Sequence, residues 1–343
     1  MNKILTFLIC LPLFTAAQQT INASITHGGL ERDYILYIPA SYSPGTEVPL
    51  VFNFHGYTSN ATVQMFYGDF RAIADNEGFI IVHPEGTLDN NGTSHWNVGW
   101  GASTVDDIGF TEALMDELIG TYSIDNNRIY STGMSNGGFM SYQLACELSD
   151  RIAAIASVTG SMNIGWFNSC NPNHPMPVME IHGTVDPTVS YSASSFTESI
   201  PDIMDFWANF NNCNSNALVT AVPNTSTNDG CTAEHQLLEN GDNGVSVELY
   251  KIIDGEHSWP GALFANGVTN YDINASEKIW EFFNKYDING LITTTSTSNI
   301  TIEKSPQLVK IVDVLGRVTN PKANTLVFYI YEDGKVEQKL RVE

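Results

Sequence analysis

The chain has 343 residues, of which 43% are hydrophobic, and 15 Lys and Arg stand against 38 Asp and Glu, for a formal net charge of −23. The hydrophobic fraction is sufficient for one large domain and a small one. The negative charge disfavours nucleic acid, anionic membranes and polyanionic substrates as partners, although it can equally serve solubility alone. Residues 1–290 hold 8 Lys and Arg against 32 Asp and Glu, whereas residues 291–343 hold 7 against 6. We therefore expect two parts of the chain that differ in charge, an acidic large part and a nearly neutral small one.

The first residues have the pattern of an export signal. Lys3 precedes the apolar run 4–14, and Thr15-Ala16-Ala17 follow it. The run is too short to span a bilayer, and the order of a cation, an apolar run and small residues is typical of a secretory signal peptide. We expect residues 1–17 to be removed and the protein to be secreted, either extracellular or on the cell surface.

Strand-like apolar runs alternate with helical patterns over residues 18–288. Strands are predicted at 34–38, 50–54, 79–83, 128–132, 153–158, 178–182 and 245–252. Helices are predicted at 62–76, 107–122, 136–148, 201–211 and 276–285. Near-continuous apolar strands are typical of a parallel sheet covered on both faces, so the predicted fold class is α/β with a mostly parallel central sheet flanked by helices. Ligands of such sheets bind beyond the carboxyl ends of the strands.

A Gly-x-Ser-x-Gly turn lies between the strand 128–132 and the helix 136–148. Gly133 and Gly137 flank Ser135, and this pattern holds a serine exposed at a strained turn. A serine hydroxyl is a weak nucleophile unless a base removes its proton, so the motif predicts a histidine and a carboxylate elsewhere in the chain.

Two other strand ends supply these groups. Asp186 follows the strand 178–182, and His257 follows the strand 245–252 on a loop that contains glycine and proline. The order Ser135, Asp186, His257 is that of the α/β-hydrolases. We predict Ser135 as nucleophile, Asp186 as orienting acid and His257 as base. Three other histidines directly end strands, and we expect them to be structural: His55, His83 and His182.

The turn after the strand 50–54 is a candidate oxyanion hole. We predict that the backbone N–H groups of Tyr57 and Asn136 stabilise the charge that develops on the ester oxygen. An ordinary strand-to-loop turn is the alternative.

Four cysteines follow the signal segment: Cys146, Cys170, Cys213 and Cys231. An even number in an exported protein indicates disulfides, and sequence alone leaves three pairings open. We favour Cys146 with Cys170 and Cys213 with Cys231, because each pair closes a short loop. No spacing indicates zinc, and neither a metal nor a cofactor is predicted.

Three tryptophans are candidates for the wall of an acyl or sugar pocket. Trp96 and Trp100 lie on one glycine-containing loop, and Trp259 directly follows His257. Tryptophan is equally an ordinary core residue, so both interpretations stay open.

Six ordered motifs carry a resemblance to a known family. They are NFHGYTSN (53–60), WNVGW (96–100), VDDIGF (105–110), GMSNGGFMSY (133–142), IHGTVDP (181–187) and GEHSWPG (255–261). Over about residues 25–285 the chain resembles the extracellular polyhydroxybutyrate depolymerase and feruloyl esterase family. The resemblance implies a single-domain α/β-hydrolase at 18–288 with Ser135, Asp186 and His257 as its triad. Enzymes of that family cleave hydroxycinnamoyl or acetyl esters on plant polysaccharides, or aliphatic polyesters.

Beyond the catalytic part, a polar Thr- and Ser-rich segment predicts a linker at 289–300. Strands are predicted at 308–314, 325–331 and 335–342, the last two joined by a turn at 332–334. The segment 301–343 resembles the C-terminal sorting domain of the type IX secretion pathway of Bacteroidetes. The resemblance implies a partner in an outer-membrane exporter. A small carbohydrate-binding sandwich is the alternative.

These observations predict a secreted serine carboxylic-ester hydrolase that acts as a feruloyl or acetyl esterase on plant polysaccharide esters. The alternatives are a depolymerase of polyhydroxyalkanoate or polyester oligomers, a peptidase of the same fold, and a non-catalytic carbohydrate-binding surface protein.

Overall fold

The computed structural model describes residues 18–265, 267–293, 308–312, 317–319, 326–331 and 336–340. The chain divides into two compact units, Met1–Ile292 and Thr293–Glu343, and the division lies inside the predicted linker at 289–300. The predicted signal peptide lies outside the described residues. None of the helices in the described part of the chain is long and apolar enough to cross a bilayer.

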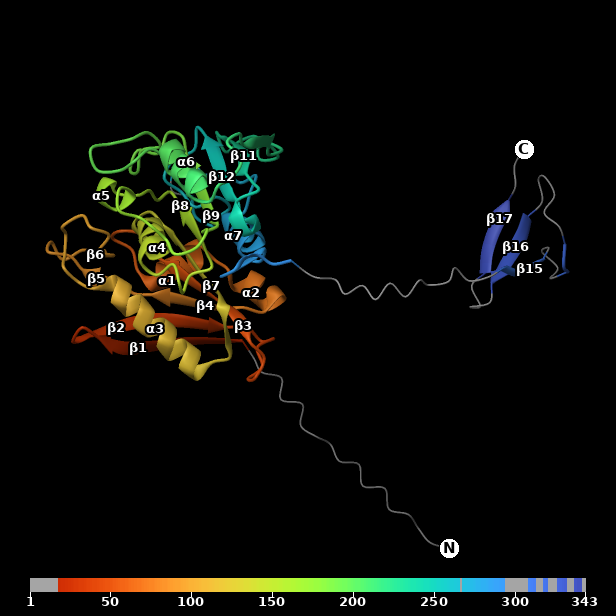
Figure 1. Cartoon of the computed structure of the whole chain (residues 1–343), viewed down its shortest axis with the longest axis horizontal. Helices are drawn as coiled ribbons and strands as arrows, with labels where there is room; N and C mark the ends of the chain where they lie inside the picture. Colours follow the sequence, from red (N-terminus) through yellow and green to blue (C-terminus); the bar gives the residue numbers. More distant parts are fainter. Residues whose placement is uncertain are drawn as a thin grey trace, which may run out of the picture. The chain divides into compact units, whose positions relative to one another are not determined.

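The first unit is built on a ten-stranded sheet with the order β1-β2-β4-β3-β7-β8-β9-β12-β11-β10 (Figure 1). The strands are β1 (Gln19–His27), β2 (Leu30–Ile38), β3 (Val48–Phe54), β4 (Ile80–Pro84), β7 (Ile124–Met134), β8 (Ala154–Val158), β9 (Val178–Gly183), β10 (Leu218–Ala221), β11 (Thr232–Leu238) and β12 (Val247–Ile253). The six strands from β4 to β12 in this order run parallel. Antiparallel strands complete both edges of the sheet. The predicted mostly parallel sheet is confirmed.

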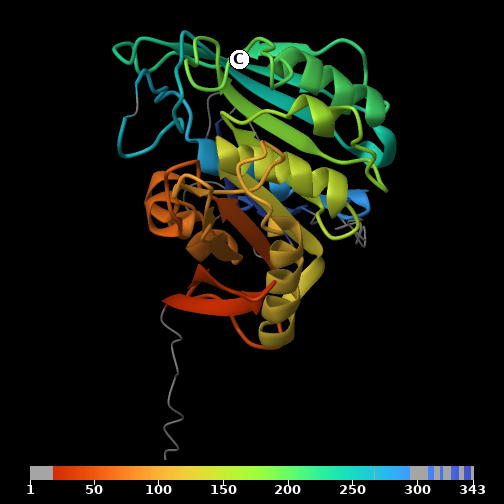
Figure 2. The same ribbon diagram turned by 90° about the vertical axis from the view of Figure 1, so that its left-hand side faces the viewer.

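Helices cover both faces of the sheet (Figures 1 and 2). They are α1 (Ala61–Tyr67), α2 (Arg71–Glu77), α3 (Asp107–Thr121), α4 (Asn136–Glu147), α5 (Ile164–Phe167), α6 (Ile200–Phe210) and α7 (Ala275–Phe283). Residues of α3, α4 and α6 share one core cluster with Leu50 and Phe52 of β3. Residues of α2 and α7 share a second cluster with Val51, which points to the opposite face. Alternate residues of one central strand are thus buried in two different cores.

The predicted helix at 62–76 is in fact two helices. α1 ends at Gly68, and a side chain at that position would lie 2.9 Å from the ring of Trp259. The carboxylate of Asp69 then accepts the backbone N–H of Arg71, where α2 begins. The break lets Phe70 enter the second core, where it is fully buried.

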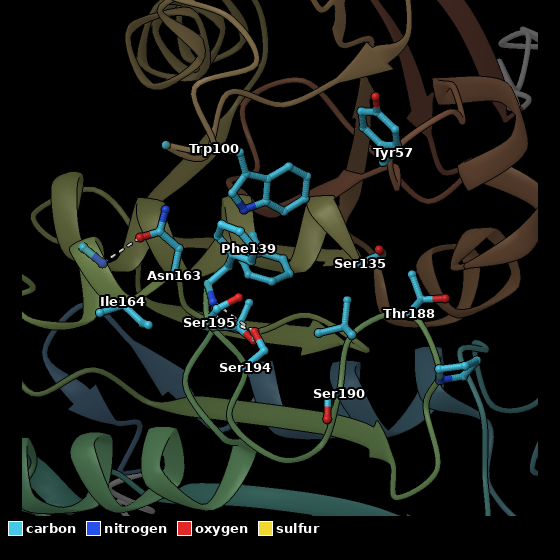
Figure 3. A pocket seen from close by; sticks show the side chains of 16 residues that line it. Tyr57, Trp100, Ser135, Phe139, Asn163, Ile164, Thr188, Ser190, Ser194 and Ser195 are labelled. Carbon is cyan, nitrogen blue, oxygen red and sulfur yellow. Dashed lines mark hydrogen bonds between the residues drawn. The ribbon is translucent and has the colours of Figure 1, made fainter.

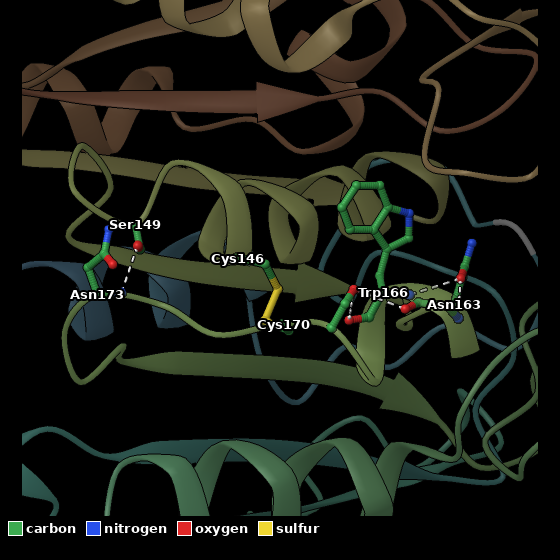
Figure 4. The surroundings of a disulfide bond; sticks show 8 residues. Cys146, Ser149, Asn163, Trp166, Cys170 and Asn173 are labelled. Carbon is green, nitrogen blue, oxygen red and sulfur yellow. Dashed lines mark hydrogen bonds between the residues drawn. A yellow bond between two sulfur atoms is a disulfide. The ribbon is translucent and has the colours of Figure 1, made fainter.

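The Cys146–Cys170 disulfide links the end of α4 to the segment after α5, as we predicted (Figure 4). The predicted bond between Cys213 and Cys231 is wrong, since both are free thiols in the described chain. Cys213 packs against the core on the α6 side of the sheet, whereas Cys231 belongs to the core on the other side. The sheet therefore separates two cysteines that are close in sequence.

The second unit contains a small antiparallel sheet. Its described strands are β15 (Leu308–Val312), β16 (Leu326–Tyr331) and β17 (Val336–Leu340), in that order. Both neighbouring pairs are antiparallel, which confirms the three predicted strands. The predicted turn at 332–334 lies outside the described residues.

Candidate active site

Ser135 lies at the sharp turn between β7 and α4. Its backbone has φ 54° and ψ −118°, a conformation that non-glycine residues rarely adopt. Its N–H donates to the carbonyl of Val158 at 2.8 Å, which fixes the turn against β8. A side chain on Gly133 would lie 2.6 Å from the carbonyl oxygens of Phe54 and Gly137, so only glycine fits there. Backbone strain of this kind persists where function requires it.

Asp186 and His257 form a hydrogen-bonded pair. Oδ2 of Asp186 lies 2.7 Å from Nδ1 of His257. Oδ1 of the same carboxylate accepts the backbone N–H groups of Thr188 and Val189 at 2.8 and 2.9 Å. The carboxylate is fully buried, and the imidazole is 13% exposed. Because a carboxylate accepts only, the pair places a proton on Nδ1 of His257.

The three predicted triad residues meet at one end of the sheet. Ser135 follows β7, Asp186 follows β9, and His257 follows β12. A cavity of about 500 Å³ has both Ser135 and His257 in its wall, together with Tyr57 and Thr188. The carboxyl ends of the parallel strands thus bring together residues that are far apart in sequence.

The predicted oxyanion-hole groups flank Ser135. Asn136 is the first residue of α4, where backbone N–H groups have no partner within the helix. Its side chain bonds both the N–H and the C=O of Trp96, at 2.6 and 3.1 Å. Tyr57 lines the cavity, and its hydroxyl donates to Asp89 at 2.8 Å. Both backbones are therefore anchored by side-chain hydrogen bonds.

Buried His55 shapes the turn that carries Tyr57. Its Nε2 accepts the N–H of Gly86 at 2.9 Å, and its Nδ1 lies 2.8 Å from the carbonyl of Gly56. The ring is therefore neutral, with its proton on Nδ1. Burial lowers its pKa to about 4, which keeps this arrangement intact at neutral pH.

A second, larger cavity of about 830 Å³ also has Ser135 in its wall. Trp100 and Phe139 meet edge to face at 5.2 Å, and Tyr57 and Trp100 meet at 6.4 Å. Figure 3 shows Trp100 and Phe139 beside one another on one side of Ser135, with Thr188 on the other. Val189 and two exposed apolar side chains, Ile164 and Phe196, also line this cavity.

Of the three predicted pocket tryptophans, Trp100 lines the larger cavity beside Ser135. Trp100 is 40% exposed, whereas Trp96 and Trp259 are almost completely buried. The indole N–H of Trp96 donates to the carbonyl of His55 at 2.9 Å. Trp259 packs edge to face on Phe70 in the second core. For Trp96 and Trp259 the core interpretation that the sequence left open therefore holds, and their rings do not line the cavity.

Sequence reasoning missed most of the apolar wall. Phe139 lies one turn of α4 after Ser135, and this spacing could have identified it. Ile164 begins the short helix α5 and Phe196 lies in the loop before α6, and neither belongs to a motif that we recognised. We expected His182 to be structural, and the structure places its Nε2 3.5 Å from Oδ2 of Asp186 and its Nδ1 2.9 Å from Oε1 of Glu180.

The fold and the strained serine turn define the class of protein as an α/β-hydrolase. The family model for esterase PHB depolymerase matches residues 32–212. This match covers more than half of the chain, and the chain belongs to that family. The family that we predicted is therefore confirmed.

Curated relatives of the chain include two esterases from fungi. The chain is 30% identical over 173 residues to the bifunctional acetylxylan esterase/xylanase XynS20E of Neocallimastix patriciarum, covering 50% of this chain and 24% of that protein. It is 29% identical over 239 residues to feruloyl esterase B of Piromyces equi, covering 66% of this chain and 42% of that protein. The chain therefore spans less than half of the length of both relatives.

Among solved structures, the acetyl xylan esterase from Aspergillus awamori is similar, with a TM-score of 0.53. The match covers 77% of this chain and 99% of that one at 14% identity. At this identity the likeness shows a shared fold.

Proposed function

We propose that the chain is a serine carboxylic-ester hydrolase in which Ser135 is the nucleophile, His257 the base and Asp186 the orienting acid. The observation that carries the proposal is the position of strained Ser135 in the same cavity wall as His257, whose Nδ1 bonds Asp186. Membership of an esterase family supports the same reaction.

In the proposed reaction, Oγ of Ser135 attacks the carbonyl carbon of the ester while Nε2 of His257 accepts the hydroxyl proton. The backbone N–H groups of Tyr57 and Asn136 stabilise the resulting oxyanion. Collapse of this intermediate breaks the bond to the alcohol oxygen, which receives the proton from His257. Water then attacks the acyl-enzyme with His257 again as base, and the carboxylic acid is released.

The two cavities beside Ser135 allow the acyl and alcohol parts of the ester to be assigned to separate binding sites. His257 lines the cavity of about 500 Å³ and not that of about 830 Å³. Because the departing alcohol takes its proton from His257, we assign the alcohol to the smaller cavity and the acyl group to the larger one.

The acyl cavity favours a flat aromatic group. Its wall offers the rings of Trp100, Phe139 and Tyr57, and aromatic pairs prefer the edge-to-face and offset geometries that these rings provide. Feruloyl esterase B and the acetylxylan esterase are similar proteins, which supports hydroxycinnamoyl or acetyl esters of plant polysaccharides as substrates. The polyester-oligomer alternative has the support of the family name and of the apolar wall.

We also propose that the protein is secreted and that the second unit is a sorting signal for an outer-membrane exporter. The apolar run 4–14 with its small following residues supports export. The antiparallel unit β15-β16-β17 follows a Thr- and Ser-rich segment and has a nearly even charge balance.

Turnover and labelling of the chain lacking residues 1–17 test the proposed reaction. Ser135→Ala should lower kcat on p-nitrophenyl acetate by about 10⁴-fold and abolish reaction with a fluorophosphonate. Ser41→Ala, which changes an exposed serine in a turn, is the matched control and should retain both. Near-normal turnover by Ser135→Ala would refute the assignment.

The substrate is decided by kcat/KM for methyl ferulate relative to that for a 3-hydroxybutyrate oligomer. We expect a ratio above one. A ratio well below one would transfer the assignment to polyester oligomers.

A further inference from the structure

Two ionisable side chains, Glu180 and His182, lie fully buried behind Asp186 on the same face of β9. Oε1 of Glu180 is 2.9 Å from Nδ1 of His182, and the hydroxyl of Tyr142 donates to Oε2 at 2.8 Å. Nε2 of His182 lies 2.8 Å from the carbonyl oxygen of Val189 and 3.5 Å from Oδ2 of Asp186. These contacts form a continuous polar chain from α4 to the proposed triad.

The contacts of His182 fix the number of protons on the pair. A carbonyl oxygen can only accept, so Nε2 carries a hydrogen that is directed at Val189. Nδ1 faces a carboxylate oxygen, so a second hydrogen lies between His182 and Glu180. A neutral imidazole beside an ionised carboxylate would have one proton fewer and two acceptors in contact. Burial of a charged Glu180 or of a charged His182 without its partner would in addition cost free energy.

Burial raises the pKa of Glu180, which by itself would place the shared proton on the carboxyl, whereas the further contacts of His182 place it on the ring. Burial by itself would lower the pKa of His182. The hydrogen bond and charge of Glu180, the Val189 carbonyl and the charge of Asp186 outweigh burial and raise this pKa above its ordinary value.

We propose that His182 is an imidazolium held by Glu180 that positions Asp186 and sets the acid limit of the esterase reaction. This inference rests on the proposed function. His182 holds the carbonyl of Val189, whose N–H in turn binds Oδ1 of Asp186, so the loop that orients the carboxylate is fixed from both sides.

The same cation lies beside the pair formed by Asp186 and His257. Nε2 of His182 approaches Oδ2, the carboxylate oxygen that also binds His257. Glu180 contacts the opposite nitrogen of the ring, so the positive member of the pair, His182, lies nearer to Asp186 than the negative member does. A nearby positive charge lowers proton affinity. Removal of this positive end is therefore expected to move the acid limb of the reaction to higher pH, which is the quantity that the experiment measures.

Two tyrosines beside His182 stay uncharged over the working range. Tyr191 meets the ring at 6.1 Å, and burial raises its pKa to about 12. Burial also raises the pKa of Tyr142. On β12, Lys251 is the register partner of His182 and is paired with Glu234 of β11 at 3.2 Å. A substitution of Glu180 therefore changes the charges beside Asp186 only through the pair of Glu180 and His182.

Glu180→Gln tests the proposal through the pH dependence of kcat/KM. The amide can donate to Nδ1, which allows a neutral His182 to keep its bond to Val189. We expect the acid limb to move to higher pH by about one unit, because the positive end beside Asp186 is lost. Tyr142→Phe is the matched control: it removes a hydrogen bond to the same carboxylate without changing the proton count, and its acid limb should coincide with that of the wild type. An acid limb of Glu180→Gln at the wild-type pH would overturn the proposal.

A second measurement does not depend on activity. In ¹⁵N-labelled wild-type protein at pH 8, the ring of His182 should show two N–H groups, assigned by their loss in His182→Gln. A single N–H at that pH would refute the imidazolium even if the protein is an esterase. If Ser135→Ala retained turnover while His182 showed two N–H groups, the proposed function would fail and the proton count would stand.

Discussion

Removal of the Cys146–Cys170 disulfide is a perturbation whose cost can be worked out from the structure. The bond closes a loop with a sequence separation of 24 residues. The loss of chain entropy in the unfolded state for a loop of this length corresponds to about 3.5 kcal/mol at 25 °C. The double variant Cys146→Ala/Cys170→Ala should lose about this much free energy of unfolding.

Urea denaturation followed by tryptophan fluorescence measures this loss. All 6 tryptophans lie in the first unit, so the signal reports on the unit that contains the bond. Cys213→Ala, which removes a free thiol, is the control and should cost less than half of the double variant. A loss below about 1 kcal/mol in the double variant would refute the loop-entropy reasoning.

The same double variant should also change substrate binding. The bond ties the end of α4, whose first turn carries Phe139, to the segment after α5, whose Ile164 lines the acyl cavity (Figure 4). We expect KM for methyl ferulate to rise while kcat for p-nitrophenyl acetate stays nearly constant. A large fall in kcat on the small ester would show that the bond supports Ser135 itself and not the cavity wall.

Three further predictions concern the cavity, acid stability and the second unit. Trp100→Ala should raise the ratio of KM for methyl ferulate to KM for an acetyl ester roughly tenfold. Trp259→Ala should destabilise the fold by about 3–5 kcal/mol and leave this ratio of KM values unchanged. An equal effect of both substitutions on the ratio would contradict the placement of these rings. Burial lowers the pKa of His83 from 6.5 to about 3. As the pH falls through 6.5, the unfolded chain therefore takes up a proton before the folded chain does. The free energy of unfolding should decrease by up to about 1.4 kcal/mol per pH unit between pH 6.5 and 3. Urea titrations at several pH values should show a smaller slope for His83→Leu. A chain that ends at Ile292 should keep its specific activity on p-nitrophenyl acetate, and a loss of activity in this folded fragment would favour a substrate-binding role for the second unit.

The central strands and the candidate triad were predictable because both depend on local signals. Strands such as β3 are buried on both faces and form continuous apolar runs. Polar residues with glycine follow directly where β9 and β12 end, and parallel strands place such ends at one edge. The positions of Asp186 and His257 therefore follow from strand boundaries that the composition marks clearly.

The edge strands and the cavity wall depend on contacts that the local sequence does not specify. β1 alternates between exposed and half-buried positions and contains Thr, Asn and Ser, so it lacks the apolar run by which we identified strands. Ile164, at the start of α5, and Phe196, in the loop before α6, acquire their role only because the fold places them in the same cavity wall as Ser135. The direction of a tryptophan ring is likewise set by its neighbours, which is why Trp96 and Trp100 differ within one loop.

The strongest signal that we did not use is a polar residue inside a central strand. β9 reads Val-Met-Glu-Ile-His-Gly, and all six residues are buried. A carboxylate in the middle of a buried parallel strand conflicts with the apolar pattern and costs free energy unless it is paired. Such conflicts between local pattern and fold concentrate at functional sites. His182 ends a strand, which by itself indicates a structural role, but Glu180, two residues earlier on the same face, indicates that the strand carries a charge pair toward Asp186.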